Sequence, residues 1–359
     1  MQAAVFHETG QDKAEIRDDL VVLGPDRGEV RVRIRATGVC HSDLSAMDGT
    51  LPQPPPCVLG HEGAGEIIGV GEGVDHLVVG DHIIVAWVPP GGHCRSCVKG
   101  DANLCLTYTI AAMGNPRFRV GDTPYFGMAG IGTFAEELTL PHQAAVKIDD
   151  DVPYEIGALM GCGVMTGVGS VMNVAKVRPG DSVAVVGCGG VGISVIQGAR
   201  IAGAAEIVAV DMIDRKLDWA RQFGATHAVT PDETEHLKHE LTAGDGFDHV
   251  FEVVGSARTI RSAYDLTRRG GNTVVVGVGR PDDPITFNPF ELLFMDRTIK
   301  PSYYGGARVP GDFHRLISLW RAGRLDLEGM ITRRLVLPDL NDAFEALRAG
   351  EVIRQVITF

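Results

Sequence analysis

The sequence predicts an α/β protein that combines a doubly wound parallel sheet with a second, β-rich domain. Two observations carry this prediction. After about residue 153, short apolar runs alternate with amphipathic segments, as strands alternate with helices in a parallel sheet. Before that point, apolar runs are broken by glycines and by a long stretch rich in Gly, Pro and Cys, which is typical of a compact β-rich region.

Composition limits the classes of function. The chain has 359 residues, which at ~100–200 residues per domain favours two domains. Its 45% hydrophobic and 22% charged residues are ordinary for a globular protein. The net charge is −13, and no basic run is longer than two residues. A nucleic-acid binder or an anionic-membrane binder needs clustered Lys and Arg, so both roles are disfavoured.

Localisation is predicted to be cytoplasmic. The N-terminus has no basic start followed by an apolar run, and the seven cysteines are odd in number, which fits a reducing compartment. Two uncharged stretches, 156–175 and 182–199, could resemble membrane spans. Their density of glycine favours buried core instead.

The first predicted domain covers residues 1–153. Residues 29–36 alternate charged and apolar side chains, as a half-buried strand does. Short apolar runs within 64–88 are separated by glycine turns and predict further strands. Residues 91–132 show little periodicity and form an excursion too long for a simple connection.

The region 154–303 carries the alternating pattern. The run 183–186 is continuously apolar, as in a strand buried on both faces. The expected elements after the helix that follows it are strand 207–210, helix 214–223, strand 227–229, a polar helix near 232–242, strand 249–254, helix 257–268 and strand 273–278. The remaining residues, 304–359, predict helices 311–322 and 340–349 with strands 331–337 and 352–359.

A glycine-rich turn predicts a dinucleotide site. Gly187, Gly189 and Gly192 fit the G-x-G-x-x-G spacing between a strand and a helix, with Cys188, Gly190 and Val191 between them. The helix N-terminus offers free N–H groups to a pyrophosphate. Asp211 follows the next strand, where a carboxylate binds the ribose hydroxyls and repels a 2′-phosphate, so NAD is expected rather than NADP. The alternative is that Asp211 only caps the next helix.

Three further motifs predict a catalytic zinc. Cys40, His61 and Cys162 supply a ligand set suited to Zn²⁺ that leaves a fourth position open. Asp43 and Glu62 are candidate acids behind these ligands, and Ser42 could accept a substrate proton. Each motif alone also has a structural explanation, since Cys40 and Cys162 could be core residues and His61 a turn residue.

A second cluster contains Cys94, Cys97 and Cys105. Closely spaced thiols on an irregular loop usually bind structural zinc, which needs four ligands. Only three cysteines are present, and the adjacent His93 is poorly placed to reach the same ion as Cys94. Two interpretations stay open: a structural zinc site, or a loop that has lost its metal.

Taken together, these motifs resemble the zinc-dependent medium-chain alcohol dehydrogenases of the medium-chain dehydrogenase/reductase superfamily, and within them a class III-like branch. The resemblance extends over essentially the whole chain, from Cys40-His41-Ser42-Asp43 to Gly350-Glu351-Val352-Ile353-Arg354. It implies a GroES-like catalytic domain over 1–153 with a zinc loop at 91–132. It also implies an NAD-binding Rossmann domain over 154–303 and a return of 304–359 to the catalytic domain.

The resemblance also implies roles for individual residues. Cys40, His61 and Cys162 would ligate the catalytic zinc, Ser42 would begin a proton relay, and Asp43 would support His61. The implied cofactor contacts are His41 and Arg354 at the pyrophosphate, Lys216 beside Asp211 at the adenosine ribose, and Thr166, Val191, Val276 and Val278 around the nicotinamide. Leu51 and Trp87 would line the substrate pocket.

Four positions depart from the family pattern. Gly91 stands where a fourth zinc-loop cysteine would be, and Ser45 stands where several members end the relay with histidine. Leu51 replaces an acidic residue typical of the branch that acts on the glutathione–formaldehyde adduct. Pro301 falls near an edge strand often used for dimerisation, and proline cannot donate to a strand ladder.

The predicted reaction is the reversible oxidation of an alcohol to an aldehyde or ketone, with hydride transfer to NAD. One alternative is a related dehydrogenase that keeps NAD tightly bound and uses an external electron acceptor. Another is a non-catalytic NAD- or zinc-binding protein on a retired enzyme fold. A homodimer or homotetramer is expected.

Overall fold

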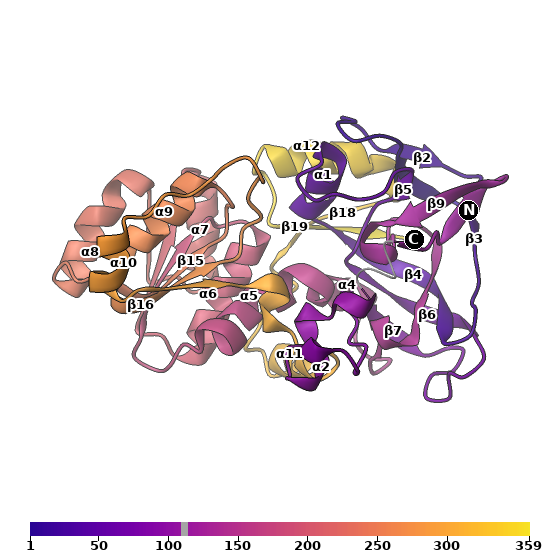
Figure 1. Cartoon of the computed structure of the whole chain (residues 1–359), viewed down its shortest axis with the longest axis horizontal. Coiled ribbons are helices and arrows are strands. Elements are labelled where there is room, and N and C mark those ends of the chain that lie inside the picture. Colours follow the sequence, from indigo (N-terminus) through magenta and orange to yellow (C-terminus); the bar gives the residue numbers. More distant parts are fainter. Residues whose placement is uncertain (109–113) are drawn as a thin grey trace. The chain divides into compact units, whose positions relative to one another are not determined.

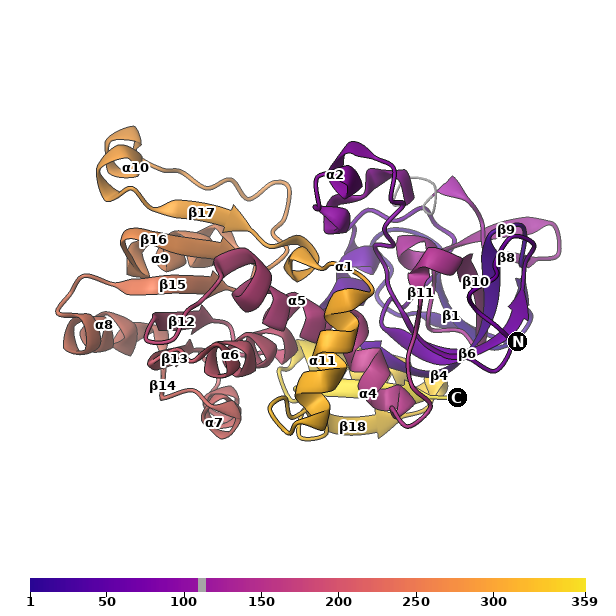
Figure 2. The ribbon, with the colours of Figure 1, turned by 90° about the horizontal axis from the view of Figure 1, so that it is seen from below.

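A computed structural model describes residues 1–108 and 114–359, and the chain divides into two compact units (Figures 1 and 2). The first unit comprises Met1–Gly163, Arg308–Arg321 and Leu327–Phe359. The second comprises Val164–Ala307 and Ala322–Asp326. The first unit is therefore assembled from both ends of the chain, and the second from its middle.

The second unit contains a six-stranded, all-parallel sheet. Its strand order is β14 (His227–Val229), β13 (Glu206–Val210), β12 (Ser182–Val186), β15 (Phe247–Glu252), β16 (Thr267–Val275) and β17 (Thr298–Pro301). The helices are α5 (Met165–Gly169), α6 (Gly190–Ala202), α7 (Asp214–Phe223), α8 (Thr234–Thr242), α9 (Ala257–Leu266) and α10 (Pro289–Met295). The order reverses direction between β12 and β15, as in dinucleotide-binding folds, which confirms the predicted doubly wound sheet.

Strand β12 shows why helices cover both faces of this sheet. Ala184 and Val186 pack in one core cluster with Leu237 of α8 and Ala263 of α9. Val185 points the other way, because a Cβ added at Gly192 in α6 would lie 3.8 Å from its Cγ1. Successive side chains of a strand face opposite sides, so a strand between two helical layers must be apolar throughout.

Several predicted boundaries in this sheet are wrong, and two of them have a clear physical cause. Helix α9 ends at Leu266, and strand β16 begins at once with Thr267, six residues before the predicted start. The Thr267 hydroxyl donates a 2.8 Å hydrogen bond to Ala263 O, so this first residue of β16 also caps the C-terminus of α9. Strand β15 ends at Glu252 rather than at residue 254. The Glu252 carboxylate accepts hydrogen bonds from the backbone N–H groups of Val254 and Gly255, which therefore do not join the sheet.

The first unit is β-rich, as predicted. One sheet has the order β2 (Glu15–Arg17), β1 (Ala3–Phe6), β5 (Cys57–Val58), β9 (Thr123–Gly127), β8 (Phe118–Val120) and β3 (Val21–Val22). The other has the order β11 (Ala145–Lys147), β7 (His82–Val85), β6 (Gly63–Val70), β4 (Glu29–Val39), β19 (Arg354–Thr358) and β18 (Ile331–Leu335), with β10 (Glu137–Pro141) beside β4. Its helices include α1 (His41–Asp48), α2 (Arg95–Val98), α4 (Tyr154–Leu159), α11 (Gly311–Arg321) and α12 (Leu340–Arg348).

Strand β4 leads the chain into the site. Val30, Val32 and Ile34 alternate inward and are fully buried, in agreement with the predicted half-buried strand. The strand extends to Val39 because β19, from the far end of the chain, pairs antiparallel with its last residues. Helix α1 then begins one residue after Cys40.

The uncharged stretch 156–175 lies in a helical run, Tyr154–Ala175, that is long and apolar enough to cross a membrane. In the residues that the structure describes it is the only such run, and 78% of its apolar window is buried inside the protein. It contains two π-helical segments, Met160–Val164 and Ser170–Ala175. It is therefore a core helix, and its first π segment carries Cys162.

Candidate metal centre and dinucleotide-binding turn

Four side chains converge in the first unit. One ligand atom each from Cys40, His61, Glu62 and Cys162 lies within 4.8 Å of the other three, and all four residues are buried. Cys40 ends the β4–α1 connection, and His61 and Glu62 come directly before β6. The structure thus brings together the three residues predicted as zinc ligands, with Glu62 among them.

Asp43 holds the imidazole of His61 in a single orientation. Asp43 is fully buried, and its Oδ1 lies 3.2 Å from His61 Nδ1 and accepts a 3.1 Å hydrogen bond from Gly60 N. Its Oδ2 accepts from Cys40 N at 3.0 Å. The other imidazole nitrogen, His61 Nε2, is buried without a hydrogen-bond partner among the described residues. This nitrogen is therefore available as a metal ligand beside the thiols.

The charges in this cluster are strongly coupled. Burial raises the pKa of Asp43. Burial alone would lower the pKa of His61, but the Asp43 carboxylate and the Cys40 thiol together outweigh burial and raise that pKa to about 10. The neighbouring Cys162 thiol holds the pKa of Cys40 well below its usual value, against the opposite effect of burial. A thiolate is thus favoured at Cys40, and the thiolate is the form that binds metal.

Glu62 forms a buried ion pair behind the thiols. Its Oε2 accepts from Arg354 Nη2, and its Oε1 accepts a 3.2 Å hydrogen bond from Gly163 N. A Cβ at Gly38 would overlap Glu62 Oε2, so this strand position has room only for glycine. Arg354 is only 4% exposed. Its predicted contact with the NAD pyrophosphate stays a prediction.

The cluster fits a zinc ion. Two thiols and one imidazole nitrogen form the ligand set that tetrahedral zinc prefers, with a position left for substrate. The carboxylate behind His61 is the usual partner of a metal-bound imidazole, because it fixes the ring's tautomer and orientation.

Replacing Asp43 with asparagine is expected to weaken zinc binding by about 10- to 100-fold, because the charge that orients His61 is lost. The zinc retained per subunit after dialysis against a graded chelator measures this effect. Asp48→Asn is the matched control, since Asp48 is an exposed acid on the same helix. Equal retention by the two variants would contradict the orienting role.

Of the other residues predicted for proton transfer or substrate contact, Ser42 and Trp87 lie beside this centre. Ser42 Oγ lies 3.7 Å from Cys40 Sγ. The Trp87 ring meets the His61 ring edge-on, with centroids 6.4 Å apart. Leu51 follows α1, and its N–H donates to Ser45 O at 2.8 Å. Ser42 and Trp87 are therefore adjacent to proposed ligands.

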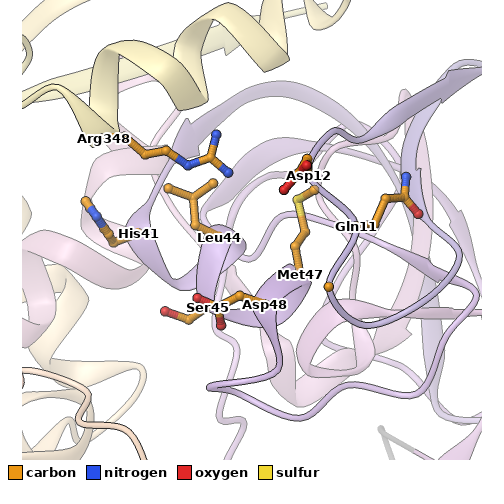
Figure 3. A pocket seen from close by; sticks show the side chains of 9 residues that line it. Gln11, Asp12, His41, Leu44, Ser45, Met47, Asp48 and Arg348 are labelled. Carbon is orange, nitrogen blue, oxygen red and sulfur yellow. The ribbon is translucent and has the colours of Figure 1, made fainter.

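His41 lies at a separate hollow of about 220 Å³ in the first unit. His41, Ser45 and Asp48 line it from α1, with Arg348 from α12 and the loop of Gly10, Gln11 and Asp12 (Figure 3). The sequence provided no signal for Arg348, because it lies some 300 residues beyond α1. The predicted contact of His41 with NAD stays a prediction.

The three cysteines of the second cluster also lie close together in the structure. Cys94 Sγ lies 3.5 Å from Cys97 Sγ and 3.8 Å from Cys105 Sγ. The backbone N–H and the thiol of Cys97 lower the pKa of Cys94 to about 7. Burial raises the pKa of Cys97. Gly91 N donates to Cys105 Sγ at 3.3 Å, so the position of the missing fourth cysteine contributes only a backbone donor.

The glycine-rich turn in the second unit has the features that a pyrophosphate requires. Gly187 has φ +98°, and a Cβ at Gly192 would overlap Gly187 O. A Cβ at Gly189 would meet nothing within 4 Å, so the space above this residue is open to a ligand. Helix α6 begins at the next residue, Gly190, with its N–H groups directed to this turn.

Asp211 is tied to this turn. Its Oδ2 accepts from Cys188 N at 2.8 Å and its Oδ1 from Ile213 N at 3.1 Å, and Lys216 Nζ lies 3.8 Å away. The carboxylate therefore connects the glycine-rich turn to the residue that precedes α7. The N-cap of α7 is Ile213, and no side chain in the part of the chain that the structure describes caps the helix, so Asp211 is not its cap. The residues predicted around the nicotinamide, Thr166, Val191, Val276 and Val278, all belong to the second unit.

Two family models match this chain, one over most of each predicted domain. Residues 26–150 match the family described as "Alcohol dehydrogenase GroES-like domain", and residues 190–321 match "Zinc-binding dehydrogenase". S-(hydroxymethyl)glutathione dehydrogenase of Paracoccus denitrificans is 37% identical, over 100% of this chain and 99% of the relative. NDMA-dependent alcohol dehydrogenase of Amycolatopsis methanolica is 38% identical, over 99% of this chain and 98% of the relative.

A solved structure leads to the same conclusion. Benzyl alcohol dehydrogenase of Acinetobacter calcoaceticus superimposes with a TM-score of 0.92 at 30% identity, covering 100% of this chain and 99% of that one. Full-length similarity, two matching domains and an assembled ligand cluster all support one assignment. The chain belongs to the zinc-binding medium-chain alcohol dehydrogenase family.

Proposed function

We propose that this protein oxidises a primary alcohol to its aldehyde, reversibly, with hydride transfer to NAD. The observation that carries the proposal is the buried cluster of Cys40, His61 and Cys162, in which His61 Nε2 has no protein partner among the described residues. Zinc bound there would act as a Lewis acid that lowers the pKa of the alcohol. NAD, bound at the glycine-rich turn, would supply the redox chemistry.

Residues of this chain orient the proposed zinc ligands and would transfer the proton of the alcohol. Ser42, beside Cys40, would accept the proton of the alcohol at its Oγ and release its own hydroxyl proton, so that the hydroxyl is restored after each transfer. Asp43 keeps His61 Nδ1 occupied, so that only Nε2 is available to a metal. The buried Arg354 balances the charge of Glu62 beside Cys40, where the thiolate form is favoured.

The proposed substrate is an alcohol with an apolar body, of the aliphatic, allylic or benzylic class. Trp87 beside His61 supports this class, and so does the similarity to a benzyl alcohol dehydrogenase. The competing substrate is the glutathione–formaldehyde adduct, the substrate named for a relative, but Leu51 offers it no charge. Comparing kcat/KM for benzyl alcohol, butanol and S-hydroxymethylglutathione tests the proposal, and a preference for the glutathione adduct would refute it.

NAD is proposed over NADP because of Asp211. Replacing Asp211 with serine is expected to lower kcat/KM for NAD by at least ~10-fold and to improve use of NADP, since the carboxylate binds ribose hydroxyls and repels a 2′-phosphate. The ratio of the two kcat/KM values measures the change. Asp214→Asn, at an exposed acid on α7, is the control. An unchanged ratio in Asp211→Ser would contradict the assignment.

A second candidate keeps NAD permanently bound and passes the electrons to an external acceptor. The 38% identity to an NDMA-dependent alcohol dehydrogenase favours this candidate. The test is the absorbance of nicotinamide released from purified protein, together with turnover on NDMA without added NAD. Stoichiometric nicotinamide would support bound NAD, whereas dependence on added NAD supports the first candidate. Absence of turnover under both conditions would point to the non-catalytic alternative.

We also propose a cytoplasmic homo-oligomer. Helix α10 exposes Phe290, Leu293 and Phe294, which are 67%, 75% and 51% exposed, next to the edge strand β17. Leu293→Glu is expected to shift the mass measured by light scattering toward the monomer, because burial of this apolar group in an interface would be lost. Val79→Glu, at another exposed apolar residue of 62% exposure, is the control. A monomeric wild-type protein would disprove the proposal.

A further inference from the structure

The loop that carries Cys94, Cys97 and Cys105 is held together by its own backbone. Cys94 immediately precedes α2, and Cys97 lies within it. Gly100 N donates to Cys97 O at 3.0 Å, and Cys105 N donates to Ala102 O at 3.1 Å. These local bonds bring the three sulfurs together, so that all lie within 4.8 Å of one another. Convergence of three thiols on one point is the arrangement that a soft metal ion requires.

The described residues add no fourth histidine, cysteine or carboxylate ligand to these three thiols, and residues 109–113 contain no such residue by sequence. A Cβ at Gly91 would lie 3.4 Å from Cys105 Sγ. A side chain at position 91 could therefore reach a metal ion bound by the three thiols. Gly91 instead donates its N–H to that sulfur, and an N–H group cannot ligate a cation.

We propose that Cys94, Cys97 and Cys105 form an open three-thiolate zinc site whose fourth ligand is a small molecule from solution, either water or an added imidazole. Zinc prefers four tetrahedral ligands, and three protein ligands leave one position exchangeable. Cys94 and Cys97 are only partly buried, so solvent reaches the cluster. The ion held here exchanges its fourth ligand and is released more readily than from a closed four-cysteine site.

Gly91→Cys is the decisive variant, because it supplies the absent thiol at the position facing Cys105. Gly91→Ala is its matched control. It adds the same Cβ, which meets the Tyr108 ring at 3.0 and 3.1 Å, but it adds no ligand. The pair therefore separates coordination from crowding. If both variants fold poorly, Tyr108→Ala is added to each to relieve the contact.

Cobalt is the probe, because its visible absorption reports the ligands around it. Metal-free full-length protein is titrated with Co²⁺, and the signal of Cys94→Ser/Cys97→Ser is subtracted to remove the contribution of the Cys40 cluster. We expect a further equivalent with thiolate absorption in the wild type, whose visible bands shift on adding imidazole. Gly91→Ala should behave in the same way. Gly91→Cys should be insensitive to imidazole and should release zinc to a chromogenic chelator at least ~10-fold more slowly.

Two results would overturn the inference. If the wild type binds no further equivalent, these cysteines are not a metal site. If its bands ignore imidazole and its zinc release matches that of Gly91→Cys, the protein supplies a fourth ligand of its own. Both readouts are independent of turnover, so a failure here leaves the alcohol dehydrogenase proposal untouched.

Discussion

Replacing Cys40 with serine is expected to remove one zinc per subunit and to lower kcat by on the order of 10³-fold. Lewis-acid activation by a metal stabilises the transition state by several kcal/mol, and each ~1.4 kcal/mol corresponds to tenfold in rate. Serine cannot replace the thiolate, because its hydroxyl stays protonated at neutral pH. Metal content by mass spectrometry and steady-state turnover measure the two effects.

Cys57→Ala is the matched control for the loss of one cysteine. Cys57 is fully buried in an apolar cluster of the first unit, and burial raises the pKa of its thiol, so it is a packing residue. This variant should cost about 1 kcal/mol of stability, as a small buried truncation does, while zinc content and kcat stay at the wild-type level. If Cys40→Ser retained full zinc and turnover, the proposed catalytic centre would be wrong.

The second large effect is expected from Ser42→Ala. Transfer of a proton by a positioned side chain typically contributes 10²- to 10⁴-fold, so kcat should fall by about 10²-fold or more. Zinc content and the Kd for NAD should stay within about twofold of the wild type, because Ser42 ligates neither group in the proposal. Turnover, metal content and fluorescence titration with NADH separate these three quantities.

Ser45→Ala tests whether any serine of helix α1 has the same importance. Ser45 lies three residues further along and lines the hollow with His41 and Asp48. We expect a change in kcat of less than threefold. A deuterated alcohol gives a further readout: if proton transfer limits Ser42→Ala, its kinetic isotope effect on hydride transfer should be smaller than that of the wild type. Wild-type kcat in Ser42→Ala would remove this residue from the proton path.

Contiguous motifs could be interpreted from the sequence because their spacing already encodes their geometry. The turn Gly187-Cys188-Gly189-Gly190-Val191-Gly192 is an example, since a positive φ and a contact too close for a Cβ are properties of the residues themselves. The parallel order of the sheet followed from alternating strands and helices for the same reason. Predicted boundaries failed where side chains of neighbouring elements decide, as at Thr267 between α9 and β16.

The sequence by itself therefore predicted the fold class, the glycine-rich turn between a strand and a helix, and the membership of the two cysteine clusters. Only the tertiary structure decided how these residues meet. Glu62 and Arg354 pair across 292 residues, and no local pattern marks that contact. Cys162 reaches Cys40 and His61 through a π-helical segment of a core helix that periodicity did not reveal. Such contacts depend on how whole sheets and helices pack, and this information is distributed over the entire chain.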